Sequence, residues 1–263
     1  MGKSVGVLSI KGGVGKTSSV IALGDAISKL GKKVLLVDAN FSAPNLGMYL
    51  KIIEPKKGIH DILSRKATLR ETIHKHESFD VLPASLFDNT KISPFDLRKK
   101  ISPLKKRYDI IIIDSSPALN EETLAAMLAS DEILIVTTPD YATLSTTLKA
   151  VKMARQRDAK INGLILNKVH NKKFEISLKD IEETLDIPVL AVIPHDLNVL
   201  KSASNFVPIT TQKPMSRASE EYGKLAAVLI GEKYKPKRWR RFLKFTPKRH
   251  EINREIFYEK YFG

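Results

Sequence analysis

The chain has 263 residues and a formal net charge of +15, from 44 Lys and Arg against 29 Asp and Glu. It contains no cysteine, which excludes disulfides, cysteine-ligated zinc and cysteine-ligated iron–sulfur clusters and favours a reducing, cytoplasmic location. No apolar run approaches the roughly 18 residues of a membrane-spanning helix. The length allows one large domain or two small ones, and one α/β domain with a tail is the expectation.

Apolar, β-branched runs recur along the chain and predict strands that are buried on both faces. They cover residues 4–10, 33–39, 79–84, 108–114, 132–138, 163–169 and 188–194. Segments of helical period lie between them, including 17–31, closed by Gly31, and 145–158, opened by a Ser/Thr cluster. Alternating strands and helices predict a single domain with a mostly parallel sheet of seven or eight strands, flanked by helices on both faces.

The stretch SIKGGVGKTSS, from Ser9 to Ser19, joins the first predicted strand to the first predicted helix. It nearly matches the phosphate-binding pattern G-x-x-x-x-G-K-[ST], with Ile10 at the first glycine position. Backbone N–H groups of such a loop converge on an anion at a helix N-terminus. Lys16 is then expected to reach the terminal phosphates and Thr17 to offer its hydroxyl to Mg²⁺. The candidate nucleotide-binding residues are Lys11, Gly12, Gly13, Val14, Gly15, Lys16, Thr17 and Ser18.

Two aspartates each close a predicted strand. Asp38 ends the second run and Asp114 ends the run IIIID. Ligands of parallel sheets bind beyond the carboxyl ends of the strands, so both carboxylates are expected beside the phosphate loop. Carboxylate and hydroxyl oxygens suit Mg²⁺, which predicts a metal site made by Thr17, Asp38 and Asp114.

The motifs KGGVGKT, VLLVDAN with PNL, YDIIIIDSSP, ILIVTTPD, LILNKV and VIPHD occur in this order from about residue 3 to 231. Together they resemble the MinD/ParA family of deviant Walker A ATPases. The resemblance implies binding of ATP and Mg²⁺, an ATP-bound homodimer, and a protein activator or cargo. It also implies that Lys11 reaches the phosphates of the partner subunit, where a cation stabilises charge on the transferred phosphoryl group.

The resemblance further implies that Asn167 hydrogen-bonds adenine and that Pro194, His195 and Asp196 line the base pocket. One position departs from the family pattern: Asn40 stands where the family usually has an aspartate that orients or activates the attacking water. A neutral amide is a poorer base than a carboxylate, so slow hydrolysis is expected. The predicted catalytic residues are Lys11, Lys16, Asp38 and Asn40.

The tail, residues 232–263, is separated here from an ATPase domain at 1–231. It holds 11 Lys and Arg against 4 Glu, and 8 of the 18 aromatic residues. Pro236 and Pro247 bracket a predicted amphipathic helix at about 236–246. Its apolar and basic faces suit an anionic membrane surface. The candidate membrane residues are Trp239, Arg240, Arg241, Phe242 and Leu243.

Two other uses of this tail stay open, namely binding of nucleic acid and packing on the domain itself. Residues 248–263 interleave apolar and charged positions and do not extend the amphipathic face. Docking of these residues onto the domain body or onto a partner is a further alternative.

The leading hypothesis is a MinD-like switch, cytoplasmic and peripheral on the inner face of the cell membrane, whose ATP-dependent dimerisation controls membrane attachment and partner recruitment. One alternative is a ParA-like DNA segregation ATPase whose basic surface holds nonspecific DNA. A nonhydrolysing ATP-bound scaffold is another, motivated by Asn40. A tyrosine kinase of related fold, phosphorylated at Tyr234, Tyr258 and Tyr261, is the weakest, because these tyrosines are few and spread out.

Overall fold

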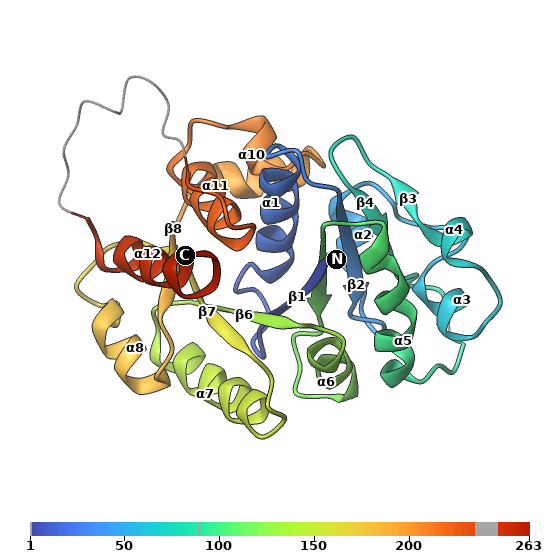
Figure 1. The fold of residues 1–263 in the computed structure, drawn as a ribbon, viewed down its shortest axis with the longest axis horizontal. Helices are drawn as coiled ribbons and strands as arrows, with labels where there is room; N and C mark the ends of the chain where they lie inside the picture. Colours follow the sequence, from blue (N-terminus) through green and yellow to red (C-terminus); the bar gives the residue numbers. More distant parts are fainter. Residues whose placement is uncertain (1, 89, 235–246) are drawn as a thin grey trace.

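The computed structural model describes residues 2–88, 90–234 and 247–263, and an eight-stranded sheet runs through it (Figure 1). The strand order is β3-β4-β2-β5-β1-β6-β7-β8. The strands are β1 (Lys3–Leu8), β2 (Val34–Ala39), β3 (His74–Lys75), β4 (Asp80–Leu82), β5 (Ile110–Ser115), β6 (Glu132–Thr137), β7 (Ile161–Val169) and β8 (Val189–Pro194). All neighbours pair in parallel except β3, which pairs antiparallel with β4.

The predicted mostly parallel sheet is confirmed, and each of the seven apolar runs overlaps one of its parallel strands. The two-residue β3 was not expected from the sequence, because His74 and Lys75 have neither the length nor the apolar character of a buried strand. It forms where the chain turns back beside β4 at the edge of the sheet.

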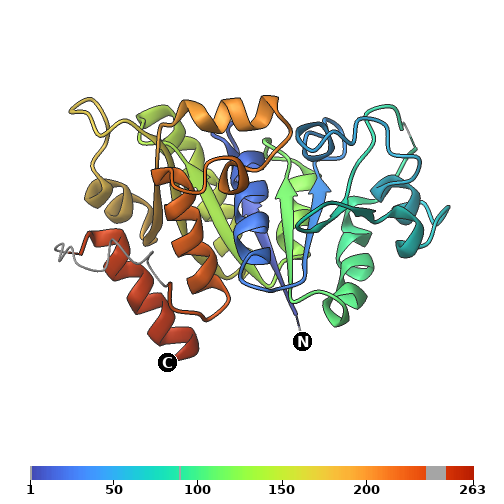
Figure 2. The ribbon, with the colours of Figure 1, turned by 90° about the horizontal axis from the view of Figure 1, so that it is seen from above.

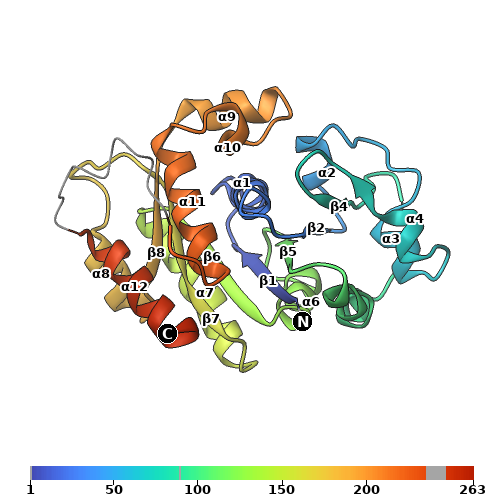
Figure 3. The ribbon, with the colours of Figure 1, turned by 45° about the horizontal axis from the view of Figure 1, so that its top comes forward.

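Helices cover both faces of the sheet (Figures 1 and 3). The α-helices are α1 (Lys16–Ser28), α2 (Leu46–Tyr49), α3 (Ile59–Leu63), α4 (Leu69–Thr72), α5 (Leu97–Ile101), α6 (Glu121–Leu128), α7 (Tyr141–Arg155), α8 (Leu178–Leu185), α9 (Leu197–Ser204), α10 (Ile209–Gln212), α11 (Arg217–Leu229) and α12 (Arg249–Phe262). Two 3₁₀ turns, η1 (Pro94–Asp96) and η2 (Ser102–Lys106), flank α5. Apolar side chains of α1 and α11 fill the core on one face, and those of α5 to α8 fill it on the other.

Helix α7 begins earlier than the Ser/Thr cluster that was expected to open it. Asp140 is its N-cap, and the Asp140 carboxylate accepts a hydrogen bond from the Thr143 backbone N–H at 2.9 Å. An aspartate three residues before a threonine satisfies an N–H that the first turn leaves unpaired. This shift brings the start of α7 to the carboxyl edge of the sheet, directly after β6.

The C-terminal helix α12 packs on the domain, over β8 and α11 (Figure 2). Phe257 is buried in the core, and Arg254 donates a hydrogen bond to the Leu190 carbonyl of β8 at 2.8 Å. Asn253 likewise donates to the Val189 carbonyl at 2.9 Å. These bonds fasten α12 to the edge strand β8.

The predicted amphipathic helix at 236–246, with its candidate membrane residues Trp239, Arg240, Arg241, Phe242 and Leu243, lies outside the described residues. Among the helices that the structure does describe, none has the length and hydropathy needed to cross a membrane.

Candidate nucleotide-binding and hydrolysis site

Three neighbouring strands deliver the main polar groups to one edge of the sheet. β5 lies between β1 and β2, and Asp38 is the direct register partner of Asp114. Val7, the second-last residue of β1, is also level with Asp114. The loop from β1 to α1 and the loops that leave β2 and β5 therefore start side by side, as the sequence predicted for Asp38 and Asp114.

The glycine loop turns sharply before α1. Gly13 and Gly15 have φ angles of 76° and 91°, a left-handed conformation that glycine adopts without a Cβ clash. A Cβ at Gly15 would also lie 2.3 Å from Nδ2 of Asn167. Gly12 and Gly13 are exposed and Val14 is buried, while Ser18 lies half-buried in the first turn of α1. The 13-residue helix directs its unpaired N–H groups at this loop, which suits an anion.

Lys16 and Thr17 both bind Asp114. The Lys16 ammonium lies 2.5 Å from Oδ1 of Asp114 and also donates to the Ser115 carbonyl, and its side chain is only 7% exposed. The Thr17 hydroxyl donates to Oδ2 of the same carboxylate at 2.7 Å. A phosphate group entering the loop would compete with Asp114 for Lys16 and leave this carboxylate available to a cation.

Asp38 is buried and organises the loop that follows β2. Its carboxylate accepts hydrogen bonds from the backbone N–H groups of Asn40, Asn45 and Leu46 at 3.1, 3.1 and 3.0 Å. Burial and the neighbouring charge of Asp114 raise the pKa of Asp38 to about 7, against the lowering effect of these bonds and of Lys16. Two adjacent carboxylates with one hydroxyl form a donor set that fits Mg²⁺, whose charge would favour ionised Asp38.

Asn40 is buried and its polar groups close its own loop. The backbone N–H donates to Asp38, and the side-chain amide donates to the Ala43 carbonyl. Asn40 therefore lies beside Asp38, one of the candidate Mg²⁺ ligands, as the sequence predicted, and it offers no carboxylate there.

Unlike the buried Lys16 side chain, the Lys11 side chain is partly exposed. Its ammonium lies 2.7 Å from the Thr143 hydroxyl and 3.2 Å from Oδ1 of Asp140, at the start of α7. The side chains of Lys11 and Asp140 are 40% and 48% exposed. Burial tends to raise the pKa of Asp140, but hydrogen bonds from Thr138, Thr143 and Lys11 outweigh it and lower the pKa below its usual range. Sequence reasoning missed Asp140 and Thr143, although their N-cap spacing was visible.

Two side chains near the C-terminal end of β7 fasten the glycine loop. Asn167 is buried, and its amide donates to the Val14 carbonyl at 2.7 Å. Lys168, which the sequence reasoning did not single out, donates to the Gly13 carbonyl at 2.6 Å. With one amide N–H on Val14, Asn167 retains a second N–H and its oxygen for a ligand, the donor and acceptor pair that an adenine edge requires.

The segment expected to line the base pocket follows β8 and lies next to the end of β7. The backbone N–H of His195 donates to the Val169 carbonyl at 2.9 Å, and the His195 ring stacks on His170 with centroids 4.4 Å apart. Pro194 ends β8. Asp196 is the N-cap of α9, where its carboxylate accepts the Asn198 N–H at 2.9 Å. The structure thus places Asn167 and residues 194–196 at adjoining strand ends.

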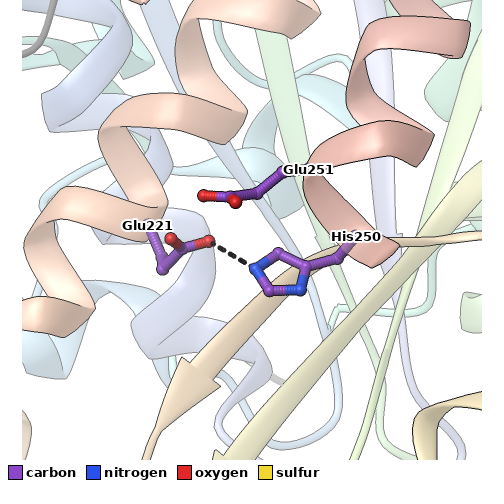
Figure 4. A group of neighbouring side chains, drawn as sticks. All are labelled: Glu221, His250 and Glu251. Carbon is purple, nitrogen blue, oxygen red and sulfur yellow. Dashed lines mark ion pairs between the residues drawn. The ribbon is translucent and has the colours of Figure 1, made fainter. Parts of the chain in front are cut away.

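A second polar cluster lies away from this edge, where α12 meets α11 (Figure 4). Nε2 of His250 is 3.5 Å from the Glu221 carboxylate, and Glu251 lies beside them, a donor set that resembles a metal site. Cations of the chain already occupy it, because Arg254 pairs with Glu221 at 2.9 Å and Lys224 pairs with Glu221 at 3.0 Å and with Glu251 at 3.2 Å. The cluster is an ion-pair network that docks α12.

The charge on Glu221 is well compensated. Burial acts to raise the pKa of this carboxyl, but the hydrogen bond from His250 and the charges of Arg254 and Lys224 outweigh it and lower the pKa to about 2.

Comparison with known proteins agrees with this architecture. A family model described as an AAA domain matches residues 2–163, and a second, described as the NUBPL iron-transfer P-loop NTPase, matches residues 104–230. The chain has no cysteine to ligate an iron–sulfur cluster. It is 32% identical to the septum site-determining protein MinD of Thermotoga maritima, over 88% of this chain and 89% of that protein.

Solved structures give the same result. MinD of Pyrococcus horikoshii, complexed with Mg-ADP, superposes with a TM-score of 0.82 at 30% identity, over 87% of this chain and 96% of that one. MinD in the MinC:MinD complex of Aquifex aeolicus superposes with a TM-score of 0.79 at 27% identity, over 90% and 98%. The glycine loop, the paired aspartates and these similarities lead to one conclusion: the chain belongs to the MinD/ParA family of P-loop ATPases, which use ATP and Mg²⁺.

Proposed function

We propose that this ATPase is a spatial-positioning switch. In this scheme two ATP-bound copies pair across their nucleotides, the pair binds an anionic membrane surface through residues 236–246, and hydrolysis separates the copies. The similarity to septum site-determining proteins supports a role in positioning within the cell. A MinD structure solved with MinC supports a protein partner for this chain as well.

The position of Lys11 is the observation that carries the dimer proposal. Lys16 is buried in the loop, whereas Lys11 lies at the rim, where the described residues that bind its ammonium are Asp140 and Thr143 at the start of α7. An ion pair as exposed as Lys11–Asp140 contributes at most about 1 kcal/mol. Lys11 can therefore leave α7 for a phosphate of a second copy, which offers a denser negative charge.

The roles of the other residues follow from their contacts. Thr17, Asp38 and Asp114 would hold Mg²⁺, which supplies charge neutralisation at the phosphates. Lys16 would exchange Asp114 for a phosphate oxygen, and Lys11 of the partner subunit would stabilise the charge of the transferred group. Asn40 would orient the attacking water but is a poor proton acceptor, so slow turnover is proposed.

Membrane attachment through residues 236–246 is supported by their composition. Each basic residue near an anionic surface contributes about 1 kcal/mol, and the apolar residues Trp239, Phe242 and Leu243 would enter the interface. One short helix binds weakly, while two copies in a dimer bind together. ATP-dependent dimerisation would in this way become ATP-dependent attachment.

The test is ATP-dependent dimerisation, measured by light scattering and by co-sedimentation with vesicles that contain anionic lipid. Wild type is expected to dimerise and sediment with ATP and Mg²⁺ but not with ADP. Lys11→Ala should bind ATP yet stay monomeric and soluble, and Lys179→Ala, an exposed lysine on α8, should behave as wild type. Dimerisation of Lys11→Ala at wild-type ATP concentrations would contradict the proposal.

Binding of nonspecific DNA is the second candidate, and the net charge of +15 favours it. A truncation at Glu232 would also remove α12, so a substitution is the better probe. Trp239→Ser, Phe242→Ser and Leu243→Ser together keep every basic residue. Loss of vesicle binding in this variant supports the membrane, whereas salt-sensitive DNA binding that exceeds vesicle binding supports the second candidate.

A further inference from the structure

Glu122 is a buried carboxylate that the roles proposed above do not use. It lies in the first turn of α6, and the residue is 7% exposed. Oε1 accepts hydrogen bonds from the Ser42 backbone N–H at 2.9 Å and from the Ser42 hydroxyl. Oε2 is also buried, and no described residue donates to it. A buried carboxylate is costly unless it is well paired, so this placement calls for a role.

Glu122 connects the two loops that follow the paired aspartates. The first turn of α6 is tied to the loop after Asp114, because the Thr123 hydroxyl donates to the carbonyls of Ser116 and Ala118 at 3.0 and 2.6 Å. The bonds from Ser42 tie the same turn to the loop after Asp38. Glu122 is thus a bridge between the two segments that start at the register partners Asp38 and Asp114.

The loop after β2 carries Asn40, and the buried side chain of Phe41 packs in the core beside it. Ser42 and Ala43 are exposed. Asp38 holds the two ends of the loop, and Glu122 holds its exposed part to α6 through Ser42. Asn40 cannot compensate for a poor position with basicity, because an amide accepts a proton far less readily than a carboxylate. Its contribution to hydrolysis depends on where the loop places it.

We propose that Glu122 is a positioning residue for ATP hydrolysis, which fastens the Asn40 loop to α6 through Ser42 so that both loops keep one arrangement around the nucleotide. The role rests on the hydrolysis step of the proposed function. Glu122 acts through Ser42 and does not itself contact ATP, so it affects the rate of the chemical step more than nucleotide binding.

Steady-state hydrolysis tests the role. Glu122→Ala is expected to lower kcat about tenfold with the KM for ATP within twofold, the pattern of an interaction that matters in the transition state. Glu122→Gln should retain part of the rate, since its amide oxygen still accepts from Ser42 but carries no charge. Glu121→Ala is the matched control, because this exposed neighbour removes the same charge from the start of α6.

Ser42→Ala removes the hydroxyl donor and keeps the backbone N–H, so its loss should be smaller, about threefold. The effect of Glu122→Ala should shrink in the Ser42→Ala background, because both changes act on one connection. An unchanged kcat in Glu122→Ala, a raised KM with kcat unchanged, or an equal loss in Glu121→Ala would each overturn the proposal.

Amide hydrogen exchange gives a readout that needs no hydrolysis. In the nucleotide-free protein the amides of residues 40–46 should exchange at least about tenfold faster in Glu122→Ala than in wild type or Glu121→Ala. Unchanged exchange would overturn the fastening. A wild-type protein without turnover would contradict the hydrolysis step itself, and the exchange comparison would still decide whether Glu122 holds the loop.

Discussion

Buried charge is handled differently at the nucleotide edge and at the contact between α12 and the domain. At the α12 contact, Glu221 pairs with two cations, Arg254 and Lys224, and its pKa is lowered to about 2. At the nucleotide edge, Asp38 and Asp114 share Lys16, the pKa of Asp38 is raised to about 7, and Glu122 has an oxygen without a donor among the described residues. Charges that are fully paired stabilise one arrangement, while incompletely paired charges leave a site ready for a cation or a phosphate.

The largest effect is expected for Lys16→Ala. This change removes the ammonium that would bind the terminal phosphates, so ATP affinity should fall at least about 100-fold by titration calorimetry. Lys11→Ala should leave the ATP affinity of the monomer within about threefold, because the Lys11 ammonium is bound to the start of α7 and not to the phosphate loop. Wild-type ATP binding by Lys16→Ala would show that the buried lysine serves only to neutralise Asp114.

Arg254→Ala should lower the stability of the fold and leave ATP affinity unchanged. It leaves Glu221 without its closest cation and the Leu190 carbonyl without its donor. Breaking a buried pair in this way costs about 3 kcal/mol, measured as a lower free energy of unfolding in urea. ATP affinity should not change. Glu255→Ala, exposed on the same helix, is the control, and a loss of stability equal to that of Arg254→Ala would contradict the role of the ion pair.

Acid should weaken the α12 contact selectively. The folded-state pKa of Glu221 lies below the ordinary glutamate value of 4.5, so its contribution to stability is complete above about pH 4.5 and is lost as the pH falls toward 2. The shift corresponds to about 3 kcal/mol. The stability difference between wild type and Glu221→Gln should therefore shrink between pH 5 and pH 3 in urea titrations. A difference that stays constant over this range would contradict the prediction.

Asp140→Asn should have the smallest effect. Asparagine caps a helix as well as aspartate, so α7 stays intact while the charge that holds Lys11 is removed. A pair this exposed contributes at most about 1 kcal/mol, so the ATP concentration needed for dimerisation should fall no more than about fivefold. The effect should vanish in the Lys11→Ala background. A higher ATP requirement would show that Asp140 is needed in the dimer.

The elements that were predictable from sequence rest on local signals. The runs that end in Asp38 and Asp114 are continuous and β-branched, and the glycine loop lies between a strand and a helix, so the parallel sheet and its edge could be derived before the structure. Asn167 was placed by family resemblance, and the structure brings it to the glycine loop.

The features that sequence patterns did not predict depend on contacts between residues that are distant along the chain. Nothing near Lys168 indicates that it binds Gly13, and nothing near Glu122 indicates Ser42, because these contacts exist only once β7, β5 and β2 are aligned. The interleaved pattern of α12 was uninformative for a related reason. Arg254 is buried because it pairs with Glu221 of α11. A helical wheel would place such a charged residue on the solvent-exposed face.

Gly15 and Asn167 restrict each other's variation. Any side chain at Gly15 would meet the Asn167 amide as well as a left-handed backbone, and the amide is held against Val14 in turn. A side chain at Gly15 therefore requires the Asn167 amide to move, and shortening Asn167 alone would leave the Val14 carbonyl without its donor. The two positions are therefore structurally coupled, and a substitution at either one disturbs the glycine loop.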